Sequence, residues 1–342
     1  MKRRNVLKQL GLGLVAGPVL MNRAFPASAQ TMEKVTVRLD WVTWGGQSPF
    51  YLPIKKGWYK DAGLDVSIEE GNGSITTIQL VNGGNFDVGH VNLAAMMQGR
   101  AKGLSVRAIA SFVRKNDVGL LVPKDSKFNS PKDLAGHKFL YTAGSLEAPF
   151  LDKFLAAGGL TRDQVELVNV ESSSKNTLYV KGGADGEFTS VPYALPYTSD
   201  RPSRGILFAD YGMQFPGFGL ISTDEKIKTR GAAIGKFATI VSAAWQYIVN
   251  GHEEEAVDAI IAARPERRPD PRILREQIDA FKPYLTSEAS KDLPVGVMAA
   301  KDWDLAVHTM REANLLGSDA KGGDFYSDRL LDVAQIKALS GS

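Results

Sequence analysis

Short runs of aliphatic and β-branched residues alternate with helical patterns along the first two thirds of this chain. The predicted strands are Val35–Trp41, Leu64–Glu69, Phe86–Val91, Val106–Phe112, Val118–Val122, His137–Thr142, Gln164–Val170 and Ala184–Phe188. The predicted helices between them are Pro49–Ala62, Ile75–Val81, Leu93–Ala101, Ala148–Ala157 and Ser174–Lys181. Because alternation of this kind pairs successive strands beneath a layer of helices, it predicts an α/β fold with parallel sheets.

The later part of the chain carries signs of a second unit and of a helical ending. Asn129–Gly136 contains a cap-forming serine, a proline at the first helical position and a terminating glycine, which together mark a fresh unit. After Phe218–Ser222 the pattern is mostly helical, with amphipathic stretches at Gly235–Asn250, Glu253–Ala263 and Arg272–Phe281. These patterns predict two α/β lobes followed by a helical return segment.

The first 29 residues have the composition of an export signal. Met1–Lys8 is basic, Leu10–Met21 is apolar but too short to span a bilayer, and Ala27–Ala29 is a small-residue cleavage site. The Arg3-Arg4 pair resembles a twin-arginine signal, with an ordinary secretory signal as the alternative. Since the chain has no cysteine for acylation, we expect a periplasmic protein without a lipid anchor.

Cleavage of that signal makes the charge nearly neutral. Five of the 41 lysines and arginines lie in it, so 36 basic side chains remain against 38 acidic ones. This balance gives no reason to expect nucleic acid or an anionic membrane as a partner. The 313 remaining residues exceed what one core usually supports, which again predicts two lobes.

Several short motifs resemble one known family when they are taken in order. They are Leu39-Asp40-Trp41, a helix from Phe50-Tyr51 to Gly57, Gly63–Val66, Gly71–Ser74, Val81–Gly84 with Asp87–Gly89, and Ser130–Gly136. Their order and spacing look like the periplasmic solute-binding proteins of the NMT1/THI5-like group. That group serves ABC importers for thiamine pyrimidines, riboflavin, sulfonates, nitrate and related small molecules.

The resemblance implies the type II periplasmic binding protein fold, with two α/β lobes joined by a two-crossing hinge. Lobe 1 is expected to comprise residues 30–114 and 220–342, and lobe 2 residues 115–219. The crossings are expected near Ser111–Gly119 and Pro216–Ser222. The implied partners are a small-molecule ligand, an ABC permease and its ATPase, and the protein is expected to be a monomer.

Polar residues in three turns are candidates for contact with a ligand. The residues are Gly73 and Ser74 in one turn, His90 and Asn92 in the next, and Ser145 and Glu147 in the third. They lie at or beyond the ends of predicted strands, and ligands of open α/β sheets bind beyond the carboxyl ends of strands. Because helix N-termini present unpaired N–H donors, such turns favour anionic or acceptor-rich groups. Simple chain reversal is the alternative for each glycine turn.

Two tryptophans favour a planar ligand. Trp41 ends a predicted strand and Trp44 lies in the following loop, where both can stack on a flat ring. With Tyr193 and Tyr197 of lobe 2 they would form an aromatic clamp. The alternative places Trp41 in the core and Trp44 on the surface.

Three further polar residues complete the candidate site. Asp40 and Glu187 would accept hydrogen bonds from ligand N–H groups, with capping or salt bridges as the alternatives. Gln47 stands where many relatives that share the Leu-Asp-Trp start carry histidine, so the resemblance alone does not carry over pyrimidine specificity. A planar heteroaromatic or aromatic acid is therefore the expected ligand. A small oxyanion such as a sulfonate, nitrate or taurine is the alternative.

Enzymatic readings find little support in the sequence. The family includes a pyrimidine-precursor synthase that depends on a cysteine-rich motif, and this chain has no cysteine. There is no Gly-x-Ser-x-Gly elbow, P-loop or paired-histidine zinc motif, so we expect neither a cofactor nor a metal. A hydrolase built from dispersed carboxylates and a sensory binding module remain as alternatives.

Overall fold

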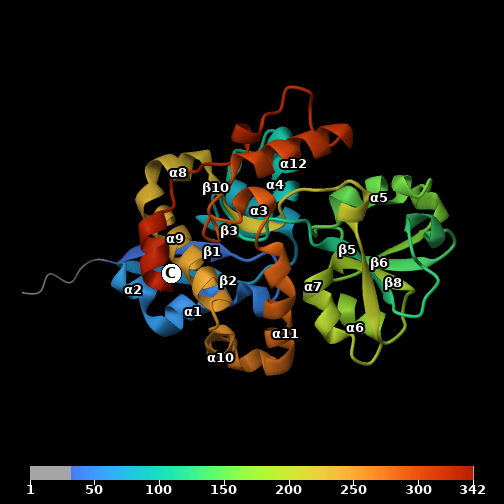
Figure 1. Ribbon diagram of the computed structural model, residues 1–342, viewed down its shortest axis with the longest axis horizontal. Helices are drawn as coiled ribbons and strands as arrows, with labels where there is room; N and C mark the ends of the chain where they lie inside the picture. The colour runs from blue at the N-terminus through green and yellow to red at the C-terminus, as the bar shows by residue number, and fades with distance from the viewer. Residues whose placement is uncertain (1–31, 342) are drawn as a thin grey trace, which may run out of the picture. The chain divides into compact units, whose positions relative to one another are not determined.

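The computed structural model describes residues 32–341, so the predicted export signal at residues 1–29 lies outside the described residues. Two five-stranded sheets organise the described chain (Figure 1). The first has the order β2-β1-β3-β10-β4, and the second β7-β6-β8-β5-β9. The strands of the first are β1 (Glu33–Arg38), β2 (Leu64–Glu69), β3 (Val88–Asn92), β4 (Val106–Ser111) and β10 (Phe218–Thr223). The strands of the second are β5 (Val118–Pro123), β6 (Lys138–Tyr141), β7 (Glu166–Asn169), β8 (Gly186–Ser190) and β9 (Ser203–Leu207).

Both sheets are mixed, which corrects the prediction of parallel sheets. β1 pairs in parallel with β2 and β3, but β10 runs antiparallel to β3 and β4. In the second sheet β6 is parallel to β7 and β8, while β5 is antiparallel to β8 and β9. The antiparallel strands β5 and β10 are the ones that follow the connections between the sheets. A strand buried on both faces is apolar throughout, so its direction leaves no mark in the sequence.

The helices that precede residue 195 flank both sheets. They are α1 (Ser48–Lys56), α2 (Trp58–Asp61), α3 (Ser74–Asn82), α4 (Leu93–Ala101), α5 (Leu151–Ala157), α6 (Lys175–Val180) and α7 (Val191–Ala194). The single helix predicted over Pro49–Ala62 is two, because Gly57 adopts a left-handed conformation with φ of 78° and ends α1. The predicted start near Ser130 is a 3₁₀ helix, Pro131–Leu134, closed by a capping box between Ser130 and Asp133.

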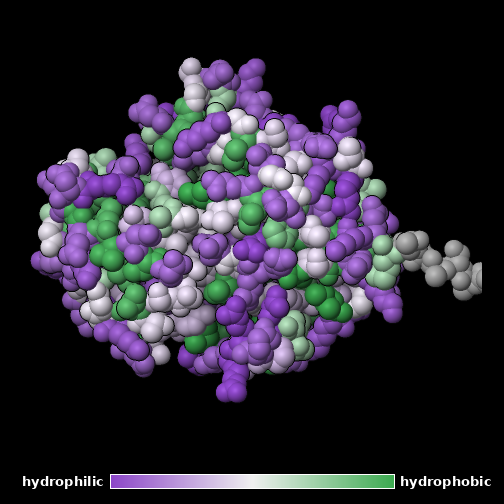
Figure 2. Space-filling view, turned by 180° about the vertical axis from the view of Figure 1, so that it is seen from behind, coloured by the Kyte–Doolittle hydropathy of each residue, from purple (hydrophilic) through white to green (hydrophobic). Residues whose placement is uncertain are grey.

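The last part of the chain is helical, as predicted. Its helices are α8 (Asp224–Thr229), α9 (Gly231–Val249), α10 (Glu253–Ala263), α11 (Pro271–Phe281), α12 (Ala300–Glu312) and α13 (Val333–Ser340). Among the described residues α9 alone is long and apolar enough to cross a membrane, yet most of it is buried inside the protein as a core helix. On the face shown in Figure 2, hydrophobic residues form separate patches among hydrophilic ones.

We call the first sheet with its helices lobe 1 and the second sheet with its helices lobe 2. Residues 112–117 and 208–217 connect β4 to β5 and β9 to β10. These two connections lie against each other, since the Gly217 N–H donates to Val113 O at 2.8 Å and Asn116 Nδ2 donates to Met213 O at 2.6 Å. The lobes are therefore joined by a paired, hydrogen-bonded neck.

Candidate functional site

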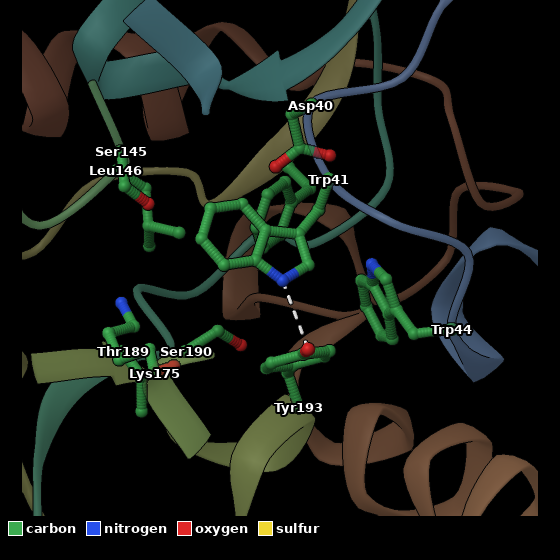
Figure 3. A pocket seen from close by; sticks show the side chains of 10 residues that line it. Asp40, Trp41, Trp44, Ser145, Leu146, Lys175, Thr189, Ser190 and Tyr193 are labelled. Atoms are coloured by element: carbon green, nitrogen blue, oxygen red, sulfur yellow. Dashed lines mark hydrogen bonds between the residues drawn. The ribbon is translucent and has the colours of Figure 1, made fainter. Parts of the chain in front are cut away.

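A small pocket takes residues from both lobes, at the carboxyl ends of β1 and β8 (Figure 3). Its lining consists of Asp40, Trp41, Trp44, Ser145, Leu146, Lys175, Thr189, Ser190, Tyr193 and Phe218. Five of these were predicted from the sequence, namely Asp40, Trp41, Trp44, Ser145 and Tyr193. The other five were missed. The position agrees with the rule that open α/β sheets bind ligands beyond the carboxyl ends of their strands.

Aromatic side chains from both lobes meet in this pocket. Trp41 Nε1 donates to Tyr193 OH at 3.0 Å, and the two rings meet edge to face with centroids 6.3 Å apart. Trp44 contacts Tyr193 at 5.5 Å and also packs on Phe281 of α11 at 4.8 Å. Trp44 is 3% exposed, so it is not a surface residue. Tyr197 lies 5.7 Å from Tyr193 and supports it from outside the pocket.

The pocket is narrow as it stands. Its cavity volume is about 20 Å³, which is on the order of one water molecule. In Figure 3 the Trp41 indole lies between Asp40 and Tyr193. A six-membered ring therefore needs Trp41 and Tyr193 to separate before it can lie against either of them.

Asp40 is held by a buried polar network. Its Oδ1 lies 3.0 Å from His90 Nδ1 and 3.5 Å from Gln47 Nε2, and its Oδ2 accepts from Ser74 Oγ at 3.4 Å. Ser74 Oγ accepts the Asn92 N–H at 3.0 Å, and Asn92 Oδ1 caps α4 through the Ala95 N–H. We predicted direct ligand contact for Gln47, Ser74, His90 and Asn92. The structure instead places them outside the pocket lining, where they orient Asp40.

One N–H at the N-terminus of α3, where we expected an anionic or acceptor-rich ligand group, has a protein partner instead. The Ile75 N–H donates to Gly144 O of lobe 2 at 3.0 Å. Gly73 has a φ of 143°, and a Cβ added there would lie 2.2 Å from Gly144 O. Glycine is therefore required because two backbones meet here, and the helix end is capped by a carbonyl.

An ion pair lies buried in lobe 2 beside the pocket. Lys175 Nζ contacts Glu147 Oε1 at 2.7 Å and donates to Phe188 O at 2.8 Å. Glu147 Oε1 also accepts the Thr142 N–H at 3.0 Å, so Glu147 holds the lysine rather than lining the pocket. Lys175 was missed because lysine is usually exposed, and nothing in its sequence context signals burial.

Two further buried carboxyl groups lie close by. Burial raises the pKa of Glu187 to about 8, with Lys175 opposing and Glu147 reinforcing the shift. Neither Glu187 oxygen has a hydrogen-bond partner within residues 32–341. Burial also raises the pKa of Asp117 to about 7, although the Ser190 hydroxyl donates to its carboxylate and opposes the shift. With Asp40 and Glu147, these residues place four buried carboxyl groups around the pocket, which suits a ligand that carries hydrogen-bond donors.

Replacement of Glu187 by glutamine is expected to weaken the pH dependence of stability. With a pKa raised from 4.5 to about 8, folded Glu187 retains a proton that the unfolded chain loses. The wild type should therefore lose stability as pH rises from about 4.5 to about 8. Glu187→Gln stays neutral, so at pH 8.5 it should exceed the wild type by about 1–3 kcal/mol.

Urea unfolding at pH 6 and pH 8.5 measures this difference. Glu171→Gln, which changes an exposed glutamate of the same lobe, is the control and should follow the wild type. If Glu187→Gln loses as much stability between pH 6 and pH 8.5 as the wild type does, the raised pKa of Glu187 is contradicted.

Comparison with solved structures identifies the fold. The alkanesulfonate-binding protein SsuA of Xanthomonas axonopodis pv. citri superposes with a TM-score of 0.66 at 14% identity, over 86% of this chain and 98% of that one. At this identity the likeness establishes the fold alone. The chain therefore has the periplasmic binding protein fold with two α/β lobes, as predicted.

Sequence comparison then gives the family. The profile described as NMT1/THI5 like matches residues 45–256, and the chain belongs to that family. The formylaminopyrimidine-binding protein of Halalkalibacterium halodurans is 25% identical over 321 residues, which are 88% of this chain and 96% of the relative. A 4-amino-5-hydroxymethyl-2-methylpyrimidine phosphate synthase of Aspergillus parasiticus is 26% identical over 139 residues, 40% of each chain. The chain thus combines the periplasmic binding protein fold with membership of the NMT1/THI5-like family.

Proposed function

We propose that this protein is the periplasmic substrate-binding component of an ABC importer and that its ligand is a small, planar, aminopyrimidine-like heteroaromatic. The observation that carries the proposal is the meeting of Trp41 and Tyr193 from opposite lobes, next to the buried carboxylate of Asp40. Such rings sandwich a flat ligand, and a carboxylate accepts hydrogen bonds from an exocyclic amino group. The full-length similarity to a formylaminopyrimidine-binding protein supports the same class of ligand.

A small oxyanion is the second candidate for the ligand, but the donors that would bind it already have partners in the protein. The Ile75 N–H of α3 is bonded to Gly144 O, and Lys175 is paired with Glu147. An anion would also lie close to the buried carboxyl groups of Asp40 and Glu147, which disfavours its entry. Sulfonates and nitrate should therefore bind weakly.

Ligand capture would proceed by closure of the two lobes about the neck at residues 112–117 and 208–217. The ligand ring replaces the contact between Trp41 and Tyr193 and is then desolvated between them. A membrane permease with its ATPase would receive the closed form. The receptor acts as a monomer after export, for which a twin-arginine signal at residues 1–29 is the proposed route.

A ligand panel tested on residues 30–342 decides between the two ligand classes. Formylaminopyrimidine and 4-amino-5-hydroxymethyl-2-methylpyrimidine should raise the melting temperature, and the shift should grow with the logarithm of ligand concentration. At 100 times the dissociation constant the stabilisation is about 2.7 kcal/mol. Alkanesulfonates, taurine and nitrate should leave it unchanged. The pyrimidine should be recovered intact, whereas a converted product would indicate an enzyme.

The variant Trp41→Ala tests the stacking itself. It should abolish most of the pyrimidine-induced shift, whereas Trp58→Ala, which removes a tryptophan that packs on Tyr247 outside the pocket, should retain it. Equal shifts in both variants would contradict a planar ligand held by Trp41. A shift with sulfonates alone would favour the oxyanion receptor.

A further inference from the structure

Lys175 is a buried cation at the pocket wall. It is the first residue of α6, it is about 1% exposed, and it lines the pocket with Thr189 and Ser190 of β8 (Figure 3). A buried lysine persists only when its charge is matched and its N–H groups have acceptors. Its position beside the pocket needs an explanation beyond packing.

Two of the three ammonium N–H groups have acceptors within lobe 2. One meets Glu147 Oε1 at 2.7 Å and another meets Phe188 O at 2.8 Å. Glu147 is itself fixed by the Thr142 N–H, so these contacts orient the ammonium rigidly. No third hydrogen-bond acceptor contacts Nζ within residues 32–341, and the Trp41 ring centroid lies 5.4 Å from it.

The remaining capacity of Nζ to donate matters because Lys175 lines the pocket next to Trp41. Trp41 is the ring on which the ligand is proposed to stack, so a ligand edge that enters beside Trp41 meets Lys175. In Figure 3 the Asp40 carboxylate and Lys175 lie on different sides of the Trp41 indole. One side of the pocket therefore offers an acceptor and another offers a charged donor.

We propose that Lys175 determines specificity by donating a hydrogen bond to an acceptor atom on the edge of the ligand ring. The acceptor is a ring nitrogen or a carbonyl oxygen, and Asp40 accepts from an amino group on another edge. The pocket would thus select rings with an acceptor edge and a donor edge and reject purely carbocyclic amines. This inference rests on the proposed function, because it deepens the assignment of a planar heteroaromatic ligand.

Two probes of equal shape test the acceptor edge. The ring of 4-amino-2-methylpyrimidine contains two nitrogen acceptors, and 3-methylaniline has the same outline without them. The wild type should bind the pyrimidine about 10- to 100-fold more tightly, which is the usual contribution of a hydrogen bond to a charged group. In Lys175→Met this preference should fall to within about threefold, because methionine fills similar space but cannot donate.

A second variant guards against a purely structural effect. Lys175→Met leaves Glu147 buried without its partner, which destabilises the fold. The double variant Lys175→Met/Glu147→Gln removes both charges, and the glutamine oxygen can still accept the Thr142 N–H. Its melting temperature should be closer to that of the wild type than the melting temperature of Lys175→Met is. It should still lack the preference for the pyrimidine over 3-methylaniline. Lys138→Met, at a half-exposed lysine of β6, should keep the wild-type preference.

Isothermal titration calorimetry gives the affinity of each variant for both probes, and each outcome tests either the role of Lys175 or the proposed function. A wild-type preference that survives in the double variant overturns the role of Lys175 and leaves the proposed function standing. An equal loss for both probes, with the ratio unchanged, indicates a structural role and also overturns it. Failure of the wild type to bind either probe or formylaminopyrimidine overturns the proposed function itself.

Discussion

Replacement of Gly73 by alanine should lower ligand affinity on the order of 100-fold by preventing the lobes from meeting. The added Cβ would lie 2.2 Å from Gly144 O and 2.6 Å from Gly144 C, across the boundary between the lobes. Both are backbone atoms, so no side chain can swing away to make room. Relief requires the lobes to separate, and a penalty of about 2.8 kcal/mol on closure corresponds to this loss.

Gly84→Ala is the matched control for this prediction. Gly84 also has a positive φ, of 83°, but an added Cβ there would meet nothing within 4 Å. Both variants therefore strain the backbone, and only Gly73→Ala obstructs the approach of lobe 2. Calorimetric affinity and the radius of gyration with and without ligand measure the difference. Normal affinity and normal compaction in Gly73→Ala would show that closure does not pass through this contact.

The same turn illustrates how far the sequence could be interpreted. A glycine turn that leads into a helix was recognisable at Gly71–Ser74, and it lies at the boundary between the lobes as predicted. We expected its helix N-terminus to face the ligand, whereas the Ile75 N–H is bonded to Gly144 O. Local sequence shows that a helix begins there, but only the tertiary structure shows which group caps it.

The aromatic residues were easier to predict than the polar ones. Trp41 was chosen because it ends a predicted strand, and Tyr193 was chosen as its aromatic partner in lobe 2. The structure brings the two side chains into contact. Asp117, Lys175 and Gln277 were missed, although Gln277 accepts the Gly45 N–H and donates to Tyr193 O, each at 2.8 Å. Such residues act through partners far away in the sequence, and no spacing or composition signals those partners.

Arg114 lies in the neck, and its replacement should strongly lower stability. Its guanidinium donates to Ser290 O at 3.1 Å, to Pro294 O at 2.5 Å and to Val297 O at 2.6 Å. Burial lowers the pKa of Arg114 to about 10, with Asp302 opposing, so it remains charged at neutral pH. One side chain thus ties the connection between the lobes to the segment before α12.

Arg114→Met is expected to lower the free energy of unfolding by about 3–5 kcal/mol, because several buried carbonyls lose their donor at once. Arg114→Lys retains the charge but not the planar fork, so it should lose about half as much. Arg272→Met, which breaks the exposed pair with Glu276, should change stability by less than about 1 kcal/mol.

Urea unfolding gives these three values, and hydrogen exchange shows where the loss arises. In Arg114→Met the amides of residues 287–297 should exchange faster than those of the distant second sheet, because this segment is released first. Unchanged stability in Arg114→Met would mean that water satisfies the carbonyls equally well. The neck would then be held by its paired backbone alone, and free movement of the lobes would not depend on this arginine.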